Sequence, residues 1–211
     1  MEPTPSSSPA LRKFLDSMNI GYMQWHDGIG YDIAALKEID EAELKQVESY
    51  LISRKDNDWR DVEALAALNT PTAIEALKGC LHSKNIDVKL FAVRYLKELN
   101  VLDRIEQVVV ETLPAIKIGE GLTYALALAK EYPTEAIKQK LLWCCINGND
   151  DITRVHCAAL VLYLYGKATS AFDSKNKIIY WFRTTNRNSL KEAFSKLCQQ
   201  IGIDPNSIAI D

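Results

Sequence analysis

The sequence predicts an all-α fold and, within that class, an α-solenoid of about five stacked antiparallel helical hairpins with capping helices at both ends. Apolar residues recur at three-and-four spacing through most of the 211 residues, which is typical of amphipathic helices. Two such helices recur with a period near 30 residues, the mark of a solenoid repeat. Every proline lies in an expected tail or near an expected helix boundary, and no strand pattern competes.

The stretch 58–100 shows the repeat most clearly, as DWRDVEALAALN, TPTAIEALKGCLHS and DVKLFAVRYLKELN. Asp58, Thr70 and Asp87 are expected N-caps, because their side-chain oxygens can accept a backbone N–H of the first helical turn. Pro71 suits that turn, where its missing N–H has no role. Leu96 is expected on the buried face of the third helix.

Equivalent positions in successive repeats carry Arg60, Lys89, Leu122 and Arg154, at offsets of 29, 33 and 32 residues. The array is therefore expected to span 58–201, including a C-terminal cap. Within that cap, one helix is expected in 174–185. The last helix should begin with a Ser189–Glu192 capping box and bury one apolar side. That side holds Leu190, Phe194, Leu197 and Ile201.

The N-terminal segment is expected to cap the other end. Residues 1–9 are rich in proline and serine and predict a disordered tail, and 202–211 are expected to form a C-terminal tail. Between 10 and 57 we expect capping helices and the loop NIGYMQWHDGIG. One of these helices begins at Asp40, which has capping-box spacing with Glu43.

The units DVKLFAVRYLKEL and DDITRVHCAALVLYLYG resemble HEAT repeats. In both, an acidic residue at the turn is followed by a basic residue and then by small and leucine-type positions. The resemblance covers 58–201 and implies a right-handed solenoid that binds other macromolecules along a concave surface. The segments WHDGIGYDIAALKEID and DWRDVEALAAL also resemble small bacterial HEAT-repeat proteins, some of which belong to toxin-immunity systems.

Several kinds of chemistry are disfavoured by the sequence. The net charge of −3 and the pI of about 5.7 argue against a surface that follows nucleic acid. The five cysteines form no CxxC motif, so we expect neither a metal site nor a disulfide, and the GxG at 28–30 lacks the third glycine of a nucleotide loop. We therefore expect no cofactor and no catalytic residues. The cysteine usage and the absence of a signal-like or membrane-spanning segment predict a cytoplasmic protein.

Two features point to a partner instead. Aromatic and charged residues gather in the loop before the third helix and at the start of the array, as in binding hot spots. The stretch 27–63 carries eleven acidic and five basic residues, whereas 174–201 carries six basic residues and one acidic residue. The candidate partner-binding residues are Trp25, His26, Asp27, Tyr31, Asp32, Trp59, Arg60 and Asp61. In the alternative interpretation, Trp25 plugs the end of the solenoid, Gly28 and Gly30 turn the chain, and Asp32 supports the next helix.

The leading hypothesis is a non-enzymatic protein-binding module, in its specific form an immunity-type protein whose acidic N-terminal surface holds a basic partner such as a nuclease toxin. The alternative is a HEAT-like DNA glycosylase that uses Trp143, Trp181, Asp150 and Asp151 together with the basic C-terminal helices. A lyase or chaperone for a tetrapyrrole is a third possibility that has only the fold in its favour.

Overall fold

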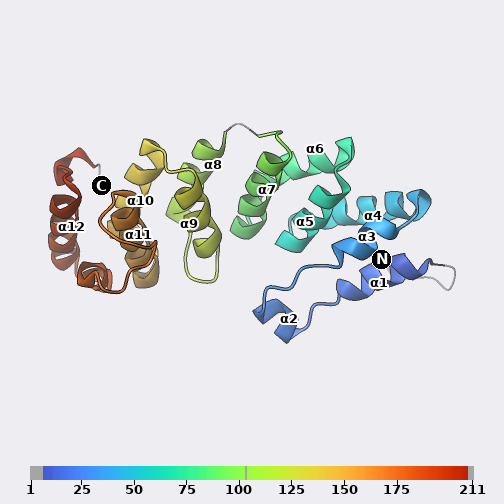
Figure 1. Cartoon of the computed structure of the whole chain (residues 1–211), viewed down its shortest axis with the longest axis horizontal. Coiled ribbons are helices and arrows are strands. Elements are labelled where there is room, and N and C mark those ends of the chain that lie inside the picture. The colour runs from blue at the N-terminus through green and yellow to red at the C-terminus, as the bar shows by residue number, and fades with distance from the viewer. Residues whose placement is uncertain (1–6, 103, 209–211) are drawn as a thin grey trace. The chain divides into compact units, whose positions relative to one another are not determined.

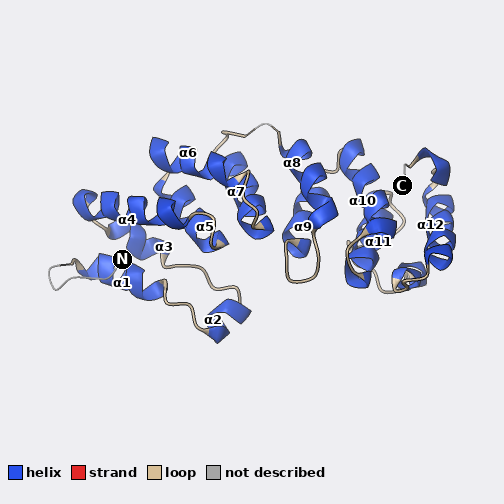
Figure 2. Cartoon of the chain, turned by 180° about the vertical axis from the view of Figure 1, so that it is seen from behind, coloured by secondary structure: helices blue, strands red, loops and turns tan. Residues whose placement is uncertain are grey.

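The computed structural model describes residues 7–102 and 104–208. This part of the chain consists of helices and connecting loops and has no β-strand, so the predicted all-α fold is confirmed (Figure 2). The chain divides after residue 103 into two compact units. We call the described residues 7–102 unit 1 and 104–208 unit 2. The division falls within the segment 58–201, for which the sequence predicts a continuous array of repeats.

Unit 1 is built from two layers of helices (Figure 1). Its helices are α1 (Pro9–Ser17), α2 (Tyr22–His26), α3 (Ile33–Glu38), α4 (Glu41–Arg54), α5 (Trp59–Leu68), α6 (Pro71–Cys80) and α7 (Ile86–Glu98). One layer holds α1, α3, α5 and α7, in which each helix contacts the next. The other holds α4 and α6, which contact each other and both pack on α5. The core of unit 1 lies between these layers.

Leucines at helical spacing form that core. Leu36, Leu51, Leu65, Leu77 and Leu96 have no exposed surface. Each comes from a different helix, so the core ties α3, α4, α5, α6 and α7 together. Burying one such side chain stabilises the fold by about 1.5–3 kcal/mol. The expected burial of Leu96 is confirmed.

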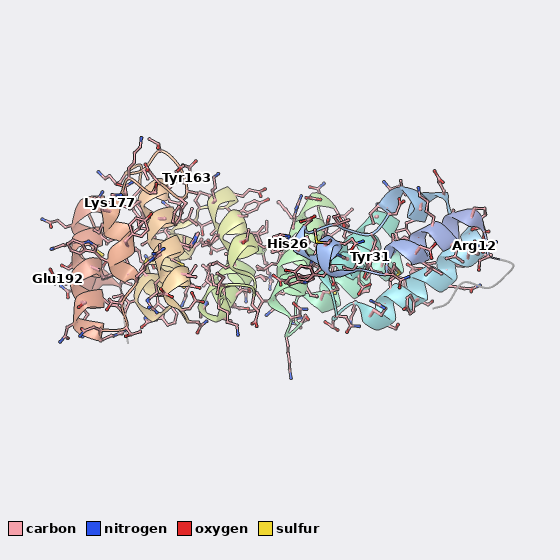
Figure 3. The ribbon with its side chains drawn as sticks, turned by 90° about the horizontal axis from the view of Figure 1, so that it is seen from below. Arg12, His26, Tyr31, Tyr163, Lys177 and Glu192 are labelled. Atoms are coloured by element: carbon pink, nitrogen blue, oxygen red, sulfur yellow. The ribbon has the colours of Figure 1, made fainter. Side chains whose placement is uncertain are left out.

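Unit 2 also has two layers. Its elements are α8 (Ile105–Thr112), the 3-10 helix η1 (Leu113–Ala115), α9 (Leu122–Glu131), α10 (Glu135–Asn147), α11 (Asp151–Leu164), the 3-10 helix η2 (Lys177–Phe182), α12 (Arg187–Ile201) and the 3-10 helix η3 (Pro205–Ser207). Contacts run from α8 to α10 to α12 in one layer, and from α9 to α11 to η2 in the other. Figure 3 marks Lys177 on η2 and Glu192 on α12. The apolar side expected for the last helix is confirmed, because Leu190, Phe194 and Leu197 are buried.

Helix starts show where local signals succeed and where they compete. Asp58 and Thr70 cap α5 and α6 as expected, and Asp40 accepts the N–H of Glu43 at the start of α4. Asp87 does not cap α7, because Asn85 stands earlier and accepts the N–H groups of Asp87 and Val88.

Two capping boxes also differ from expectation. The carboxylate of Glu43 accepts the N–H of Ser8, 2.9 Å away, so the box with Asp40 is one-sided. Ser189 is a residue inside α12, whose N-cap is Asn186. Glu192 pairs with Lys196 at 3.1 Å instead of reaching back to Ser189.

Four segments differ in detail from the expected arrangement. The expected loop contains the short helix α2, and the helix expected in 174–185 is the 3-10 helix η2. Residues 1–6 of the expected N-terminal tail lie outside the described residues, whereas Ser8 caps α1. The expected tail 202–211 includes η3 and a buried Ile208, and its last three residues also lie outside the described part.

Candidate functional site

The short helix α2 presents unusually large apolar side chains to solvent. Figure 1 shows it at the tip of the two loops that join it to α1 and α3. The α2 patch consists of Tyr22, Met23, Trp25 and Ile29, which are 72%, 63%, 63% and 50% exposed. Clustered exposed apolar side chains, two of them aromatic, are typical of a protein-binding surface.

Trp25 has the exposure expected of a partner-binding residue. Its 63% exposed surface excludes the alternative in which it plugs the end of the fold. Its ring lies 6.1 Å from that of Tyr22, and both rings face water over most of their surface. Next to them, Nδ1 of His26 lies 2.9 Å from a carboxylate oxygen of Asp27, and both side chains are exposed (Figure 3 labels His26). Three of the expected residues, Trp25, His26 and Asp27, thus share one surface.

The chain after α2 is fixed to α5 by a buried arginine. Arg60 donates from Nε to the carbonyl oxygen of Ile29, 2.6 Å away, and from Nη1 to Asp58, the N-cap of α5. Gly30 lies so close to Glu63 that a Cβ atom there would stand 2.5 Å from a carboxylate oxygen. Glycine lets the Glu63 carboxylate lie against the backbone here, whereas a larger residue would require that side chain to shift. The α2 patch is therefore anchored beside the N-terminal half of α5.

Tyr31 and Asp61 meet in the interior below this anchor. The hydroxyl of Tyr31 donates to Oδ1 of Asp61 at 3.2 Å, and Nε of Arg54 lies 3.4 Å from the same oxygen. Burial raises the pKa of the Asp61 carboxyl to about 6, against the opposing charge of Arg54. Burial and the neighbouring Asp61 charge also raise the pKa of Tyr31.

Burial changes the role of three expected residues. Tyr31, Arg60 and Asp61 are 6%, 1% and 0% exposed, so they support the surface and do not form it. Asp32 caps α3 by accepting the N–H of Ala35, and it pairs with Lys13 at 3.0 Å. The Ala35 N–H and Lys13 hold the pKa of the Asp32 carboxyl below its usual value. The interpretation of Asp32 as a support for the next helix is therefore confirmed.

Trp59, the remaining expected residue, is half-buried and lines the same side of unit 1. Its ring stacks on Phe91 of α7 with centroids 4.6 Å apart, and the guanidinium of Arg60 lies 4.6 Å from its centroid. Phe91 is followed one turn later by Tyr95, whose ring centroid lies 6.2 Å away. These aromatic rings form a row that leads from α5 to α7.

An acidic groove lies beside this row and was not predicted from the sequence. It has a volume of about 280 Å³ and lies between α3, α5 and α7. Its lining residues are Ile33, Glu63, Ala66, Ala67, Tyr95, Glu98 and Leu99, the last of which directly follows α7. We call it the Glu63 groove. Its lining includes two carboxylates and no basic side chain. The available signal was the spacing of Trp59, Glu63 and Ala66, which places all three on one face of a helix.

The groove combines charge with apolar walls. Glu63 accepts a hydrogen bond from the Tyr95 hydroxyl at 2.9 Å, and Glu98 accepts one from Nε of Arg94 at the same distance. Burial and Glu63 raise the pKa of Tyr95, so this hydroxyl keeps its proton and remains a donor. Ala66 and Ala67 leave space between the walls. A cationic side chain fits this arrangement, because its aliphatic stem can lie on apolar walls while its head reaches a carboxylate.

Three of the four residues that the glycosylase hypothesis needs, Asp150, Trp143 and Trp181, have other roles in unit 2. Asp150 caps α11 through Thr153 and also accepts the N–H of Ile118 at 3.1 Å. The Lys196 ammonium lies 4.3 Å from the ring centroid of Trp181, and that of Lys140 lies 5.0 Å from Trp143. These aromatic faces already hold cations of unit 2 itself.

We also searched the described residues for reactive cysteines, metal-ligand clusters and membrane-spanning helices. The five cysteines are buried free thiols. Across 7–102 and 104–208, no three His, Cys, Asp or Glu side chains gather as a metal site would require. None of the helices in these ranges combines the length and hydrophobicity of a bilayer span. Comparisons of the chain with protein-family models, with curated proteins and with solved structures each gave no match.

Proposed function

We propose that this chain is a protein-binding module without enzymatic activity, and that unit 1 holds a basic partner through the α2 patch and the Glu63 groove. The observation that carries the proposal is their proximity, since the chain passes from α2 to Gly30, where an added Cβ atom would stand 2.5 Å from a carboxylate oxygen of Glu63. The exposed aromatic rings would supply buried contact area, and the carboxylates would select and orient a cationic surface.

The repeated layers support the specific form of this proposal. In each unit, alternate helices contact one another in two rows, as in HEAT-like α-solenoids. We propose that the whole chain is a right-handed solenoid of this kind, and that it acts in the cytoplasm of a bacterium. An immunity-type protein that covers a basic toxin is the physiological role that best matches an acidic, aromatic surface. The glycosylase alternative receives no support from the engaged Asp150, Trp143 and Trp181.

Affinity capture from an extract of the native host tests the proposal. The parent chain should retain a basic protein, whereas the double variant Glu63→Gln and Glu98→Gln should retain much less of it at low salt. The matched control is Glu41→Gln with Glu75→Gln, which removes two charges from exposed side chains of α4 and α6 in the other layer. In the parent, Glu41 forms an exposed i,i+4 ion pair with Lys45, and Glu75 forms an exposed i,i+3 ion pair with Lys78. Loss of these two surface ion pairs should change the stability of the protein little.

A photo-crosslinking residue at position 23 then tests the geometry, because Met23 is 63% exposed on α2. The captured protein should be crosslinked from this position and not from exposed Glu192 of unit 2. Retention that is equal in parent, groove variant and control variant, with no crosslink from position 23, would contradict the proposed surface.

A further inference from the structure

Unit 2 contains a groove that is larger than the Glu63 groove and that the proposed function does not use. It lies between α9 and α11 and has a volume of about 390 Å³, within the range of pockets that hold small ligands. Residues one turn apart line both sides, with Leu122, Leu126 and Lys130 on α9 facing Ile152, His156 and Leu160 on α11. Leu122 and Lys130 are separated by eight helical steps of about 1.5 Å, which gives the groove a length of about 12 Å. We call it the α9–α11 groove.

Apolar side chains dominate the groove where the two helices begin. Ile118 precedes α9 and is 57% exposed, and its N–H is fixed by the N-cap carboxylate of α11. Phe172 is 40% exposed, and its ring centroid lies 4.6 Å from that of His156. Ile118 and Ile152 thus form an apolar end that remains open to solvent, and Phe172 adds an apolar ring beside His156.

The charge in the groove has one sign. Its lining includes Lys130 and no carboxylate. The Lys130 ammonium lies 5.4 Å from the ring centroid of Tyr163, which Figure 3 labels, and in the described ranges it makes no ion pair. The groove thus offers an unpaired cation at the opposite end from Ile118.

A polar group also stands midway along the groove. Neither ring nitrogen of His156 has a hydrogen-bond partner within the part of the chain that the structure describes. Burial and the nearby Arg183 lower the pKa of His156, so the ring is neutral near pH 7. A neutral imidazole carries one N–H donor and one acceptor. Next to an apolar ligand body, this side chain adds one directional polar contact.

We propose that the α9–α11 groove binds a small amphiphilic carboxylate, with its apolar chain or ring toward Ile118 and Phe172 and its carboxylate toward Lys130. Charge complementarity selects an anion, because the lining holds a cation without a counter-ion and no acidic group. The apolar walls select a ligand whose body carries no charge. This site lies within unit 2 and does not depend on the proposed partner surface of unit 1.

Octanoate and decanoate are suitable probes, with decanol as the uncharged equivalent. Methyl signals of Ile118, Ile152 and Leu126 would be followed by NMR during titration of the full chain below the probe's micelle concentration. We expect decanoate to shift these signals at saturable concentrations and to bind more tightly than octanoate. The replacement Lys130→Gln should weaken decanoate binding by about fivefold and leave decanol binding unchanged.

Two further variants make the result decisive. Ala127→Phe places a ring in the groove from an exposed helix position and should abolish binding without loss of helical signal. Lys191→Gln removes a charge from an exposed position of α12 outside the groove and should leave binding unchanged. Equal affinity of the parent and Ala127→Phe for decanoate would overturn the site. Equal loss of decanoate affinity in Lys130→Gln and Lys191→Gln, or equal affinity for decanol and decanoate in the parent, would overturn its selectivity for an anion.

Discussion

The hydroxyl of Tyr31 donates a hydrogen bond to the carboxylate of Asp61, 3.2 Å away and 30 residues further along the chain. Both side chains are buried, and the second carboxylate oxygen of Asp61 has no hydrogen-bond partner within the described residues. Tyr31, in the chain that follows α2, is therefore held by the carboxyl group of Asp61, whose buried environment disfavours the charged form. The position of the α2 patch and the stability of unit 1 depend on the same group.

Unit 1 should lose stability as pH rises from about 4 to about 6. In the folded state the Asp61 carboxyl keeps its proton up to a pKa of about 6, above its value of 3.8 in an unfolded chain. The folded state therefore binds more protons in this window, and unfolding becomes easier as pH increases. The contribution is at most about 3 kcal/mol. Hydrogen exchange of α5 amides from pH 4 to pH 7, corrected for intrinsic exchange rates, measures the free energy of unfolding of unit 1 at each pH.

The control is Asp61→Asn, whose amide does not titrate. Its unfolding free energy relative to the parent should fall as pH drops from about 6 to about 4, because only the parent gains a proton there. A constant difference between the two proteins across this window would show that Asp61 titrates at its ordinary pKa.

Replacement of Tyr31 by phenylalanine should destabilise unit 1 by about 1–3 kcal/mol, because the buried Asp61 carboxylate loses the hydrogen bond from the Tyr31 hydroxyl. The ring would still fill its site against Phe14, where the two rings meet edge to face at 6.1 Å. Denaturant melts of Tyr31→Phe and Tyr95→Phe provide the comparison. The Tyr95 hydroxyl donates to the half-buried Glu63, so its loss should cost less. Equal costs would contradict the special burial of Asp61.

Two neighbouring residues of α7 test the assignment of its buried face. Leu96 is 0% exposed, so Leu96→Ala should lower the unfolding free energy by about 2–5 kcal/mol. The next residue, Lys97, is half-exposed, and Lys97→Ala should change the unfolding free energy by no more than about 0.5 kcal/mol. Chemical denaturation with circular dichroism measures both, and similar losses in the two variants would mean that α7 packs differently.

The cysteine thiols should react slowly in the native protein. Burial raises the pKa of Cys80 to about 12 and that of Cys198 to about 11, which removes the reactive thiolate near pH 8. Native protein should therefore label with a disulfide reagent far more slowly than protein in urea. Because the thiols are free, a reductant should leave the melting temperature unchanged. Rapid native labelling of either residue would contradict its burial.

Helices and buried faces were predictable because they depend on local spacing. Leu96 and the apolar side of α12 follow from a 3.6-residue period, and Asp58 and Thr70 follow from capping chemistry. Cap prediction failed where two suitable residues stood close together. Asn85 precedes Asp87 and Asn186 precedes Ser189, and in both cases the earlier residue accepts the first N–H groups.

The candidate surface was predictable only in part, because burial of polar side chains depends on contacts between distant segments. Trp25, His26 and Asp27 were found from composition, and they are exposed. Arg60 and Asp61 were assigned to the surface for their charge, yet partners from 29–31 and 54 draw them into the core. The Glu63 groove needs residues from three helices, and no single stretch of sequence brings them together.

The final prediction separates the two parts of the proposed partner surface by their kinetics. Once a basic partner is captured, Trp25→Ala should mainly speed its dissociation, because the exposed ring supplies contact area and has no role in folding. Asp27→Asn, or Glu63→Gln with Glu98→Gln, should mainly slow association and flatten its dependence on salt. Surface plasmon resonance at several salt concentrations measures both rates.

Circular dichroism of each variant supplies the control, and Asp32 is left intact because it caps α3. The 63% exposure of Trp25 requires that Trp25→Ala keep the helical signal and the melting temperature of the parent. If the folded variants bind and release the partner at the parent's rates, the interaction surface lies outside the α2 patch and the Glu63 groove. The basic side chains of η2 and α12, such as Lys177 and Lys191, are then the next surface to vary.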